Sequence, residues 1–293
     1  MKISPDLAGV PETMLWTLHN RATEARRALR GKAGGLIRDP EAARIYDLID
    51  YDFERHFGKA EGSHAVRAAD IDAILRNWLG DHPDGWVVSL GEGLETQFSR
   101  VDNGRLTWLT VDLPEAIRLR SQLLPDQPRC QSFVGSALDR RWMDIVMIGL
   151  GEVGATAAKP DAGKELCIIA QGLFMYLPED EIRRLMVDLA QRFPGCLLIF
   201  DSIPRWLSRL TQRPGGLKRT RHYTIPPMPW GIDYTDVPDT LRRWGVSTES
   251  ATRPYRLPRG MPRVMGLVCA LIPFLRAKVP AITWAKLRPT VLT

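Results

Sequence analysis

The stretch Val87-Val88-Ser89-Leu90-Gly91-Glu92-Gly93-Leu94, followed along the chain by Trp108-Leu109-Thr110-Val111-Asp112, decides the fold. Each stretch contains an apolar run typical of a buried strand, and the first run ends in a Gly-x-Gly turn. The acid at the end of the second run follows at about the twenty-residue spacing that places a carboxylate on a ribose in α/β nucleotide-binding folds. Glycines let the backbone approach a ligand where a Cβ would collide. The pair therefore predicts a site for an adenosine-bearing ligand.

Strand-like and helix-like segments alternate around this motif. Apolar runs at 87–90, 107–111, 131–134, 165–170 and 197–200 are separated by segments with helix-start signals, such as Pro114-Glu115 and Pro178-Glu179. Such alternation predicts an α/β fold with a doubly wound, mostly parallel, Rossmann-like sheet. We expect one domain over residues 1–293, made of an N-terminal helical part (1–80), a cofactor-binding core (84–201) and a C-terminal substrate cover with the last strands (202–293).

Composition limits the class of protein. The chain has 293 residues, 44% of them hydrophobic, as is ordinary for a globular protein. Its four cysteines are scattered without a C-x-x-C pair, so neither disulfides nor a metal site is expected. No signal peptide is visible, and the longest apolar stretch, Val264 to Leu275, is too short to span a bilayer. We expect a cytoplasmic protein, with the apolar stretch packed in the core or the cover.

Positive charge is concentrated in the last third of the chain. Residues 201–293 carry 16 Lys and Arg against 5 Asp and Glu, whereas the whole chain has a formal charge of +6. A solvated basic surface accounts for this, as does a basic rim that attracts an anionic substrate. No nucleic-acid-binding module accompanies the charge, so a nucleic-acid partner is not expected.

A second glycine motif, Gly149-Leu150-Gly151-Glu152-Val153-Gly154, matches the dinucleotide pattern G-x-G-x-x-G and follows the apolar run Ile145–Ile148. That pattern requires a helix to open after it, yet Pro160 and Gly163 follow closely. We interpret the motif as a surface loop. The alternative, an NAD(P)-dependent oxidoreductase that uses Gly149, Gly151 and Gly154, stays open at this point.

The turn at Gly91 and Gly93 lacks the third glycine of the dinucleotide pattern but has its acid, Asp112. A shortened turn is less suited to a pyrophosphate and needs only to admit an amino-acid tail and a ribose. This favours S-adenosylmethionine over NAD. The third interpretation is a coincidental turn that binds neither cofactor.

Several motifs in order resemble those of the leucine carboxyl methyltransferase superfamily, and most closely its bacterial branch typified by the tetracenomycin polyketide O-methyltransferase. They are Leu36-Ile37-Arg38-Asp39-Pro40, Ile49-Asp50-Tyr51-Asp52-Phe53, the run from Val88 to Phe98, Val111-Asp112-Leu113-Pro114-Glu115, Ala170-Gln171-Gly172-Leu173-Phe174-Met175-Tyr176-Leu177 and Phe200-Asp201-Ser202-Ile203-Pro204-Arg205-Trp206. The resemblance covers most of residues 20–245. It implies a class I S-adenosylmethionine-dependent methyltransferase.

The resemblance also implies cofactor-binding residues. Arg67 would hold the carboxylate of the cofactor, Gly91, Glu92 and Gly93 would line its methionine part, and Asp112 with Leu113 would hold the ribose. Ser136, Ala137 and Leu138 would flank the adenine, and Gln171 would face the sulfonium. The eukaryotic, protein-modifying branch has Glu in place of Gln171 and Asp-Leu in place of Ala137-Leu138, and residues 145–163 look like an insertion. These departures weaken the case for a protein C-terminus as substrate.

The methyl acceptor is expected to bind near the cover. Tyr176 and Asp201 follow the ends of the fourth and fifth strands, where ligands bind in open α/β sheets. His222 is the one histidine in the cover region, so we consider His222, Asp201 and Tyr176 as a base or as groups that align the substrate. Arg205, Tyr223 and Trp230 are further candidates for substrate contact, each with a packing or solvated-surface alternative.

We therefore predict an O-methyltransferase that uses S-adenosylmethionine and acts on a small acidic or aromatic molecule. Methyl ester formation is favoured, because a carboxylate is already ionised at neutral pH whereas a phenol or an alcohol usually needs a base. The alternatives are the oxidoreductase and a cofactor-binding protein without turnover. A monomer and a homodimer are both compatible with the sequence.

Overall fold

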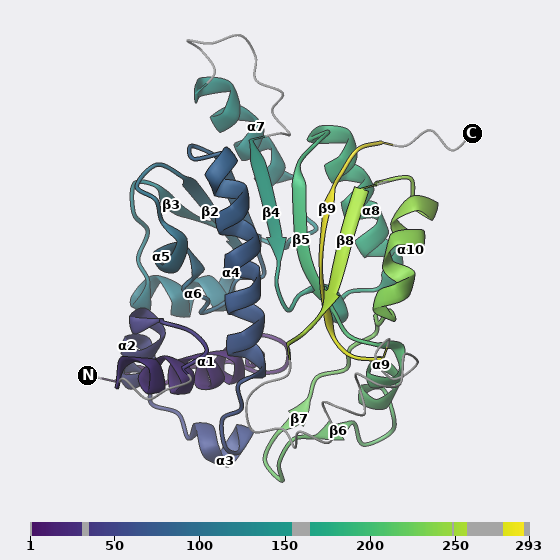
Figure 1. The fold of residues 1–293 in the computed structure, drawn as a ribbon. Helices are drawn as coiled ribbons and strands as arrows, with labels where there is room; N and C mark the ends of the chain where they lie inside the picture. The colour runs from purple at the N-terminus through teal and green to yellow at the C-terminus, as the bar shows by residue number, and fades with distance from the viewer. Residues whose placement is uncertain (1, 31–34, 154–164, 248, 257–277, 290–293) are drawn as a thin grey trace.

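A seven-stranded sheet forms the centre of the computed structural model, which describes residues 2–30, 35–153, 165–247, 249–256 and 278–289 (Figure 1). The strand order is β3-β2-β1-β4-β5-β9-β8. The first five strands along the chain pair in parallel, and β9 and β8 pair antiparallel at one edge. The strands are β1 (Trp86–Leu90), β2 (Thr107–Asp112), β3 (Cys130–Val134), β4 (Leu166–Ala170), β5 (Leu197–Ser202), β8 (Glu249–Pro254) and β9 (Ala281–Lys286).

Helices cover both faces of this sheet, which confirms the predicted doubly wound α/β fold. Consecutive strand residues point to opposite faces, so the apolar runs supply two separate cores. The helices in chain order are α1 (Thr13–Leu29), α2 (Pro40–Leu48), α3 (Phe53–Phe57), α4 (Ser63–Asp81), α5 (Gln97–Val101), α6 (Pro114–Leu123), α7 (Arg141–Val153), α8 (Glu179–Arg192), α9 (Arg205–Thr211) and α10 (Val237–Arg243).

Neighbouring residues of one strand belong to different cores, one on each face of the sheet. Val87 of β1 packs with Leu75 of α4 on one face, together with Phe98 of α5. Its neighbour Val88 packs on the other face with side chains of α7, α8 and α10. The strand order reverses between β1 and β4, and ligands bind at such a switch point, outside the carboxyl ends of the strands.

A third apolar cluster lies beyond the carboxyl ends of the parallel strands. It joins α1 and α2 to α6 and to the two-stranded ribbon β6 (Leu217–Lys218) and β7 (Thr224–Ile225). Figure 1 shows α1 and α2 crossing below the sheet at the same end as α9, β6 and β7. The expected start of α2 is confirmed, because the Asp39 carboxylate accepts a hydrogen bond from the Ala42 N–H at 2.9 Å, and Pro40 begins the helix.

The interpretation of Gly149 and Gly151 as loop residues is wrong. Both lie inside α7, and the run Ile145–Ile148 that precedes them is helical rather than a strand. Dinucleotide binding needs a glycine turn between a strand and a helix. The described part of this motif has no such turn, whereas Gly154 lies outside the described residues, as does the stretch from Val264 to Leu275.

Within the described residues, no helix is both long and apolar enough to cross a membrane.

Candidate functional site

A cavity of about 500 Å³ opens at the carboxyl ends of β1, β2, β4 and β5. Residues that end or directly follow these strands line it, among them Gly91, Asp112, Gln171 and Asp201. Its opposite wall comes from α1 and from segments after β5. The topology thus brings together residues that are more than one hundred positions apart in the chain.

The turn after β1 forms part of the wall, and its glycines are required by the backbone. Gly91 and Gly93 have φ angles of +63° and +55°, a region that side chains with a Cβ rarely adopt. A Cβ on Gly91 would lie 2.9 Å from Leu173 Cδ1, and one on Gly93 would lie 2.8 Å from Met14 Cβ. Glycine is therefore needed both for the turn and for the close approach of α1.

Asp112 holds this turn at the end of β2. One carboxylate oxygen accepts the Gly93 N–H at 2.6 Å, and the other accepts the Leu113 N–H at 2.8 Å. Burial raises the pKa of the carboxyl group, and the two backbone hydrogen bonds oppose that change. Because each carboxylate oxygen can accept more than one hydrogen bond, Asp112 keeps capacity for two ligand hydroxyls.

Glu92 lines the cavity, but its carboxylate is bound inside the protein. It accepts hydrogen bonds from Trp108 Nε1 at 3.1 Å and Thr110 Oγ1 at 2.5 Å, and it pairs with Arg120 at 3.1 Å. The side chain is fully buried. The Glu92 carboxylate is therefore not free to bind a ligand, and a cofactor contact of this residue stays a prediction for its backbone.

Glu95 is a lining residue that the sequence did not single out. Burial by itself would raise the pKa of Glu95. The guanidinium groups of Arg100 at 2.6 Å and Arg21 at 3.1 Å outweigh this effect and lower the pKa to about 2. The other Glu95 oxygen accepts a hydrogen bond from Gln171 Nε2 at 2.9 Å. This contact fixes the orientation of the Gln171 amide, and Gln171 Oε1 is left buried without a hydrogen-bond partner.

Arg67 and Asp201 form a buried ion pair, with Nη1 and Oδ2 3.1 Å apart. Asp201 also accepts the Tyr255 hydroxyl at 2.5 Å and the Gly172 N–H at 2.5 Å. Arg67, Tyr255 and Gly172 all donate to the Asp201 carboxylate. Asp201 therefore orients Arg67, and it is a poor candidate for the general base that the sequence analysis considers. Arg67 Nε is buried with no partner, which leaves a guanidinium donor for an anionic ligand.

Of the three residues expected around an adenine, two line the cavity and one does not. Ser136 and Ala137 line the cavity, as does Leu113. Leu138 does not belong to the described lining. Its side chain is partly buried against the core between the sheet and α7 and α8, and its N–H is bound to Ser136 Oγ at 3.1 Å.

The half of the cavity opposite the strand ends is mostly apolar. Tyr176 is among its polar groups, and burial raises the pKa of this phenol to about 12, so Tyr176 is a hydrogen-bond donor rather than a base at neutral pH. His64, at the start of α4, also lines the cavity and was not selected from the sequence. Apolar lining residues from α1 and from the segments after β4 and β5 include Met14, Trp16, Met175, Ile203, Leu207, Leu217, Ile225 and Met228.

Four predicted residues lie outside the described lining. The exposed His222 ring accepts a hydrogen bond from Arg221 Nε at 2.8 Å. Arg205 forms ion pairs with Asp236 and Asp233, which keep it at the surface.

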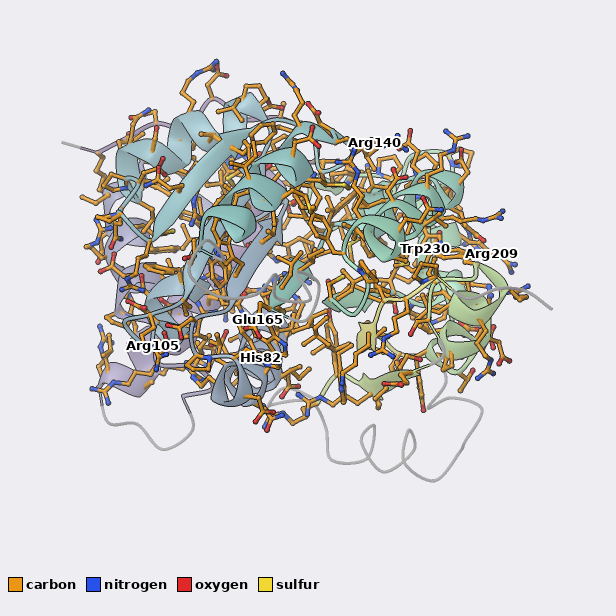
Figure 2. The ribbon with its side chains drawn as sticks, turned by 90° about the horizontal axis from the view of Figure 1, so that it is seen from above. His82, Arg105, Arg140, Glu165, Arg209 and Trp230 are labelled. Carbon is orange, nitrogen blue, oxygen red and sulfur yellow. The ribbon has the colours of Figure 1, made fainter. Side chains whose placement is uncertain are left out.

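The other two are buried in packing contacts. Tyr223 packs edge-on against Phe57, with ring centroids 4.7 Å apart. Trp230 packs against Phe174, with centroids 6.3 Å apart, and Figure 2 places it in the green, C-terminal half of the molecule. Both side chains are over 90% buried. The structure therefore agrees with the packing alternative for Trp230, and neither ring borders the cavity.

Comparison with known proteins identifies a curated relative. The chain is 28% identical over 209 residues to the tetracenomycin polyketide synthesis O-methyltransferase TcmP of Streptomyces glaucescens, and the alignment covers 70% of each protein. The resemblance inferred from the sequence motifs is thus confirmed. No protein-family model matches the chain.

Solved methyltransferase structures are similar at lower identity. The N-methyltransferase NodS from Bradyrhizobium japonicum WM9 is 12% identical, with a TM-score of 0.43, over 76% of this chain and 97% of that one. The magnesium protoporphyrin IX methyltransferase ChlM from Synechocystis PCC 6803, solved with bound SAH, is 13% identical with a TM-score of 0.43, over 85% of this chain and 93% of that one. Structural similarities at TM-scores this low do not by themselves indicate a function.

Proposed function

We propose that this chain is an S-adenosylmethionine-dependent O-methyltransferase for a small molecule with an aromatic or apolar body and an acidic oxygen, of the kind found in polyketides. The observation that carries the proposal is the Asp112-bound glycine turn at one end of a cavity whose other end is apolar. The similarity to the tetracenomycin enzyme supports the same reaction class. Methyl ester formation remains the favoured outcome.

The residues at the strand ends fit S-adenosylmethionine in three respects. Gly91 and Gly93 line the cavity in a turn of positive φ that glycine adopts readily, so backbone borders the space for a ligand. Gln171 Oε1 is an unpartnered buried acceptor suited to an ammonium group. Arg67 Nε is an unpartnered donor suited to a carboxylate, and Asp112 offers acceptors to the ribose hydroxyls.

The cofactor, when bound, supplies a methyl group on a sulfonium, which is transferred by in-line displacement. The work left to the protein is alignment of the acceptor oxygen and exclusion of water. Gln171 and the turn at Gly91 would fix the donor end, whereas Tyr176 and the apolar wall would hold the acceptor. An ionised carboxylate acceptor needs no base, which suits a lining whose strand-end acids, Asp112 and Asp201, are already hydrogen-bonded.

Calorimetry separates this proposal from its alternatives. We expect saturable binding of S-adenosylmethionine and no binding of NADH, because Gly149 and Gly151 lie in a helix. Tight NADH binding without a response to S-adenosylmethionine would overturn the proposal. A mass-difference screen for one added methyl group over aromatic acids and phenols then tests turnover. Cofactor binding without any methylated product would support the non-catalytic alternative.

A further inference from the structure

His64 is a polar residue of the cavity wall. It lies in the first turn of α4, three residues before Arg67, so both side chains lie on the same face of the helix. Both also line the cavity, together with Trp16, whose ring meets the His64 ring edge-on at 5.2 Å. His64 is thus placed between the polar end of the cavity and its apolar half.

A buried asparagine fixes which nitrogen of His64 carries the proton. Asn20 of α1 is fully buried, and its side-chain oxygen accepts the Glu61 backbone N–H at 3.0 Å. A backbone N–H can only donate, so the other side of the Asn20 amide must be its NH₂ group. That NH₂ group lies 2.7 Å from His64 Nδ1, which therefore accepts. The proton of the neutral ring is then on Nε2.

The surroundings keep this ring neutral. Burial lowers the pKa of His64 well below its usual range, and the nearby positive charges of Arg67, Arg21 and Arg219 act in the same direction. Glu95 is the opposing charge. Glu61, which also borders the cavity, lies 3.5 Å from Arg219. With Nδ1 occupied and Nε2 protonated, His64 has no lone pair to accept a proton.

We propose that His64 is a substrate-positioning hydrogen-bond donor that selects an ionised carboxylate as the methyl acceptor. The Nε2 proton is the polar group that the ring offers to the cavity, and a neutral N–H donor there is suited to a charged acceptor. An ionised carboxylate accepts such a bond and is already a nucleophile, whereas a phenol that accepts it still has to lose its proton to a base, which His64 does not provide. The inference rests on the proposed function and adds to it the residue that positions the acceptor.

Nitrogen-15 NMR of histidine-labelled protein tests the proton position without any turnover. We expect His64, assigned by its loss in His64→Phe, to show the Nε2–H tautomer and no titration between pH 6 and pH 8. An Nδ1–H tautomer, or a charged ring at pH 7, overturns the proposal. This result does not depend on the cofactor, so it is distinct from a failure of the proposed function.

Kinetics with 2-naphthoate and 2-naphthol test the selection. His64→Phe should raise the KM for 2-naphthoate roughly 10- to 100-fold, the loss expected for a hydrogen bond to a charged group, and leave calorimetric binding of S-adenosylmethionine within twofold. The control His82→Gln, at the far end of α4, should change neither value. Equal use of 2-naphthol and 2-naphthoate by the wild type, or an unchanged KM in His64→Phe, overturns the inference but leaves methyl transfer intact.

The variant Asn20→Asp tests the donor role of His64 through the pH dependence of 2-naphthoate binding, which a purely structural role of His64 would not change. A carboxylate beside Nδ1 draws the proton there and leaves a lone pair on Nε2, so 2-naphthoate should bind weakly at pH 8.5. Charging the ring at pH 6 restores an Nε2 donor and should restore binding. The wild-type KM should stay flat over this range. A flat profile in Asn20→Asp, with the NMR tautomer unchanged, contradicts the proposal.

Discussion

Asp112 is a single residue that holds the turn after β1 and to which we assign the ribose in the proposed site. It follows a buried strand and receives N–H groups from Gly93 and Leu113, one on each oxygen. Backbone N–H groups can only donate, so a carboxylate, which only accepts, matches the turn fully. The residue is placed by local sequence, because strand and acid are adjacent.

Asp112→Asn should lower the affinity for S-adenosylmethionine at least about 10-fold, since the amide brings a donor to a site that meets two N–H groups and needs acceptors for the ribose. Calorimetry measures the affinity, and a thermal melt shows whether the fold is kept. Asp126→Asn, an exposed aspartate outside the cavity, is the matched control. An unchanged affinity in Asp112→Asn would mean that another acid binds the ribose.

The histidines show how position in the fold decides a role. His222 is a candidate from the sequence because it is the one histidine in the cover region, but it is an exposed residue beside Arg221. His64 lies in an ordinary stretch of helix, and its role depends on Asn20, 44 positions away. No local pattern marks such a pair, since it exists only once α1 packs against α4.

At the scale of elements, helix α7 gives Gly149 a packing role in place of the nucleotide-binding turn that its motif resembles. Gly149 is a helical residue whose missing Cβ lets the Trp86 ring approach, because a Cβ there would lie 2.2 Å from Trp86 Cη2. The glycine is therefore a packing residue between α7 and β1.

Gly149→Ala should lower the melting temperature by several degrees. Alanine favours helix by about 1 kcal/mol, but overpacking against a ring costs about 1–3 kcal/mol. Gly80→Ala in α4 is the matched control, because nothing lies within 4 Å of its Cβ and only the helix gain applies. Calorimetry should show unchanged binding of S-adenosylmethionine in both variants. A large loss of cofactor binding in Gly149→Ala alone would restore a role for the motif.

A buried ionic cluster joins α1, α4 and α5 beside the cavity. Arg100 pairs with Asp39, Asp72 and Glu95, and Arg21 pairs with Asp39 and Glu95. Removal of one partner from such a cluster leaves another charge buried without compensation. The cluster thereby links the segment after the Gly91–Gly93 turn to the N-terminal helices.

Glu95→Gln should cost about 3–5 kcal/mol of unfolding free energy at pH 7. The folded pKa of Glu95, about 2, lies below its ordinary value of 4.5, so its contribution is present above pH 4.5 and is lost as the pH falls toward 2. The difference between variant and wild type in urea unfolding should therefore shrink between pH 4.5 and pH 3. The exposed-site control Glu249→Gln should show no such trend. A difference that is independent of pH would contradict the assigned ionisation.

At the scale of the whole molecule, the cavity lies between the strand ends and α1. Met14 of α1 approaches the Gly93 turn so closely that a Cβ on Gly93 would lie 2.8 Å from Met14 Cβ. A ligand in this cavity contacts both parts, and its binding energy adds to the stability of each.

S-adenosylmethionine should therefore slow hydrogen exchange both in residues 89–97 and in α1. Mass spectrometry of peptic peptides measures the protection, with β8 at the sheet edge as the internal reference. Protection confined to 86–112 would show that α1 does not close over the ligand.

The amino-acid sequence was sufficient to predict the five parallel strands, where they end, and the glycine turn after the first of them. Buried parallel strands read as apolar runs, and Gly91, Gly93 and Asp112 lie next to those runs in the chain. Short-range chemistry is enough to locate such residues.

Which polar side chains face the cavity, and which are bound inside the protein, depends on the packing of distant segments. Glu92, Asp201 and Trp230 are adjacent to strand ends or loops, yet their partners come from elsewhere in the fold. Glu95 and His64 gained their roles from Arg100 and Asn20. The physical reason is that burial and hydrogen bonding, which set charge and proton position, depend on neighbours distant in sequence.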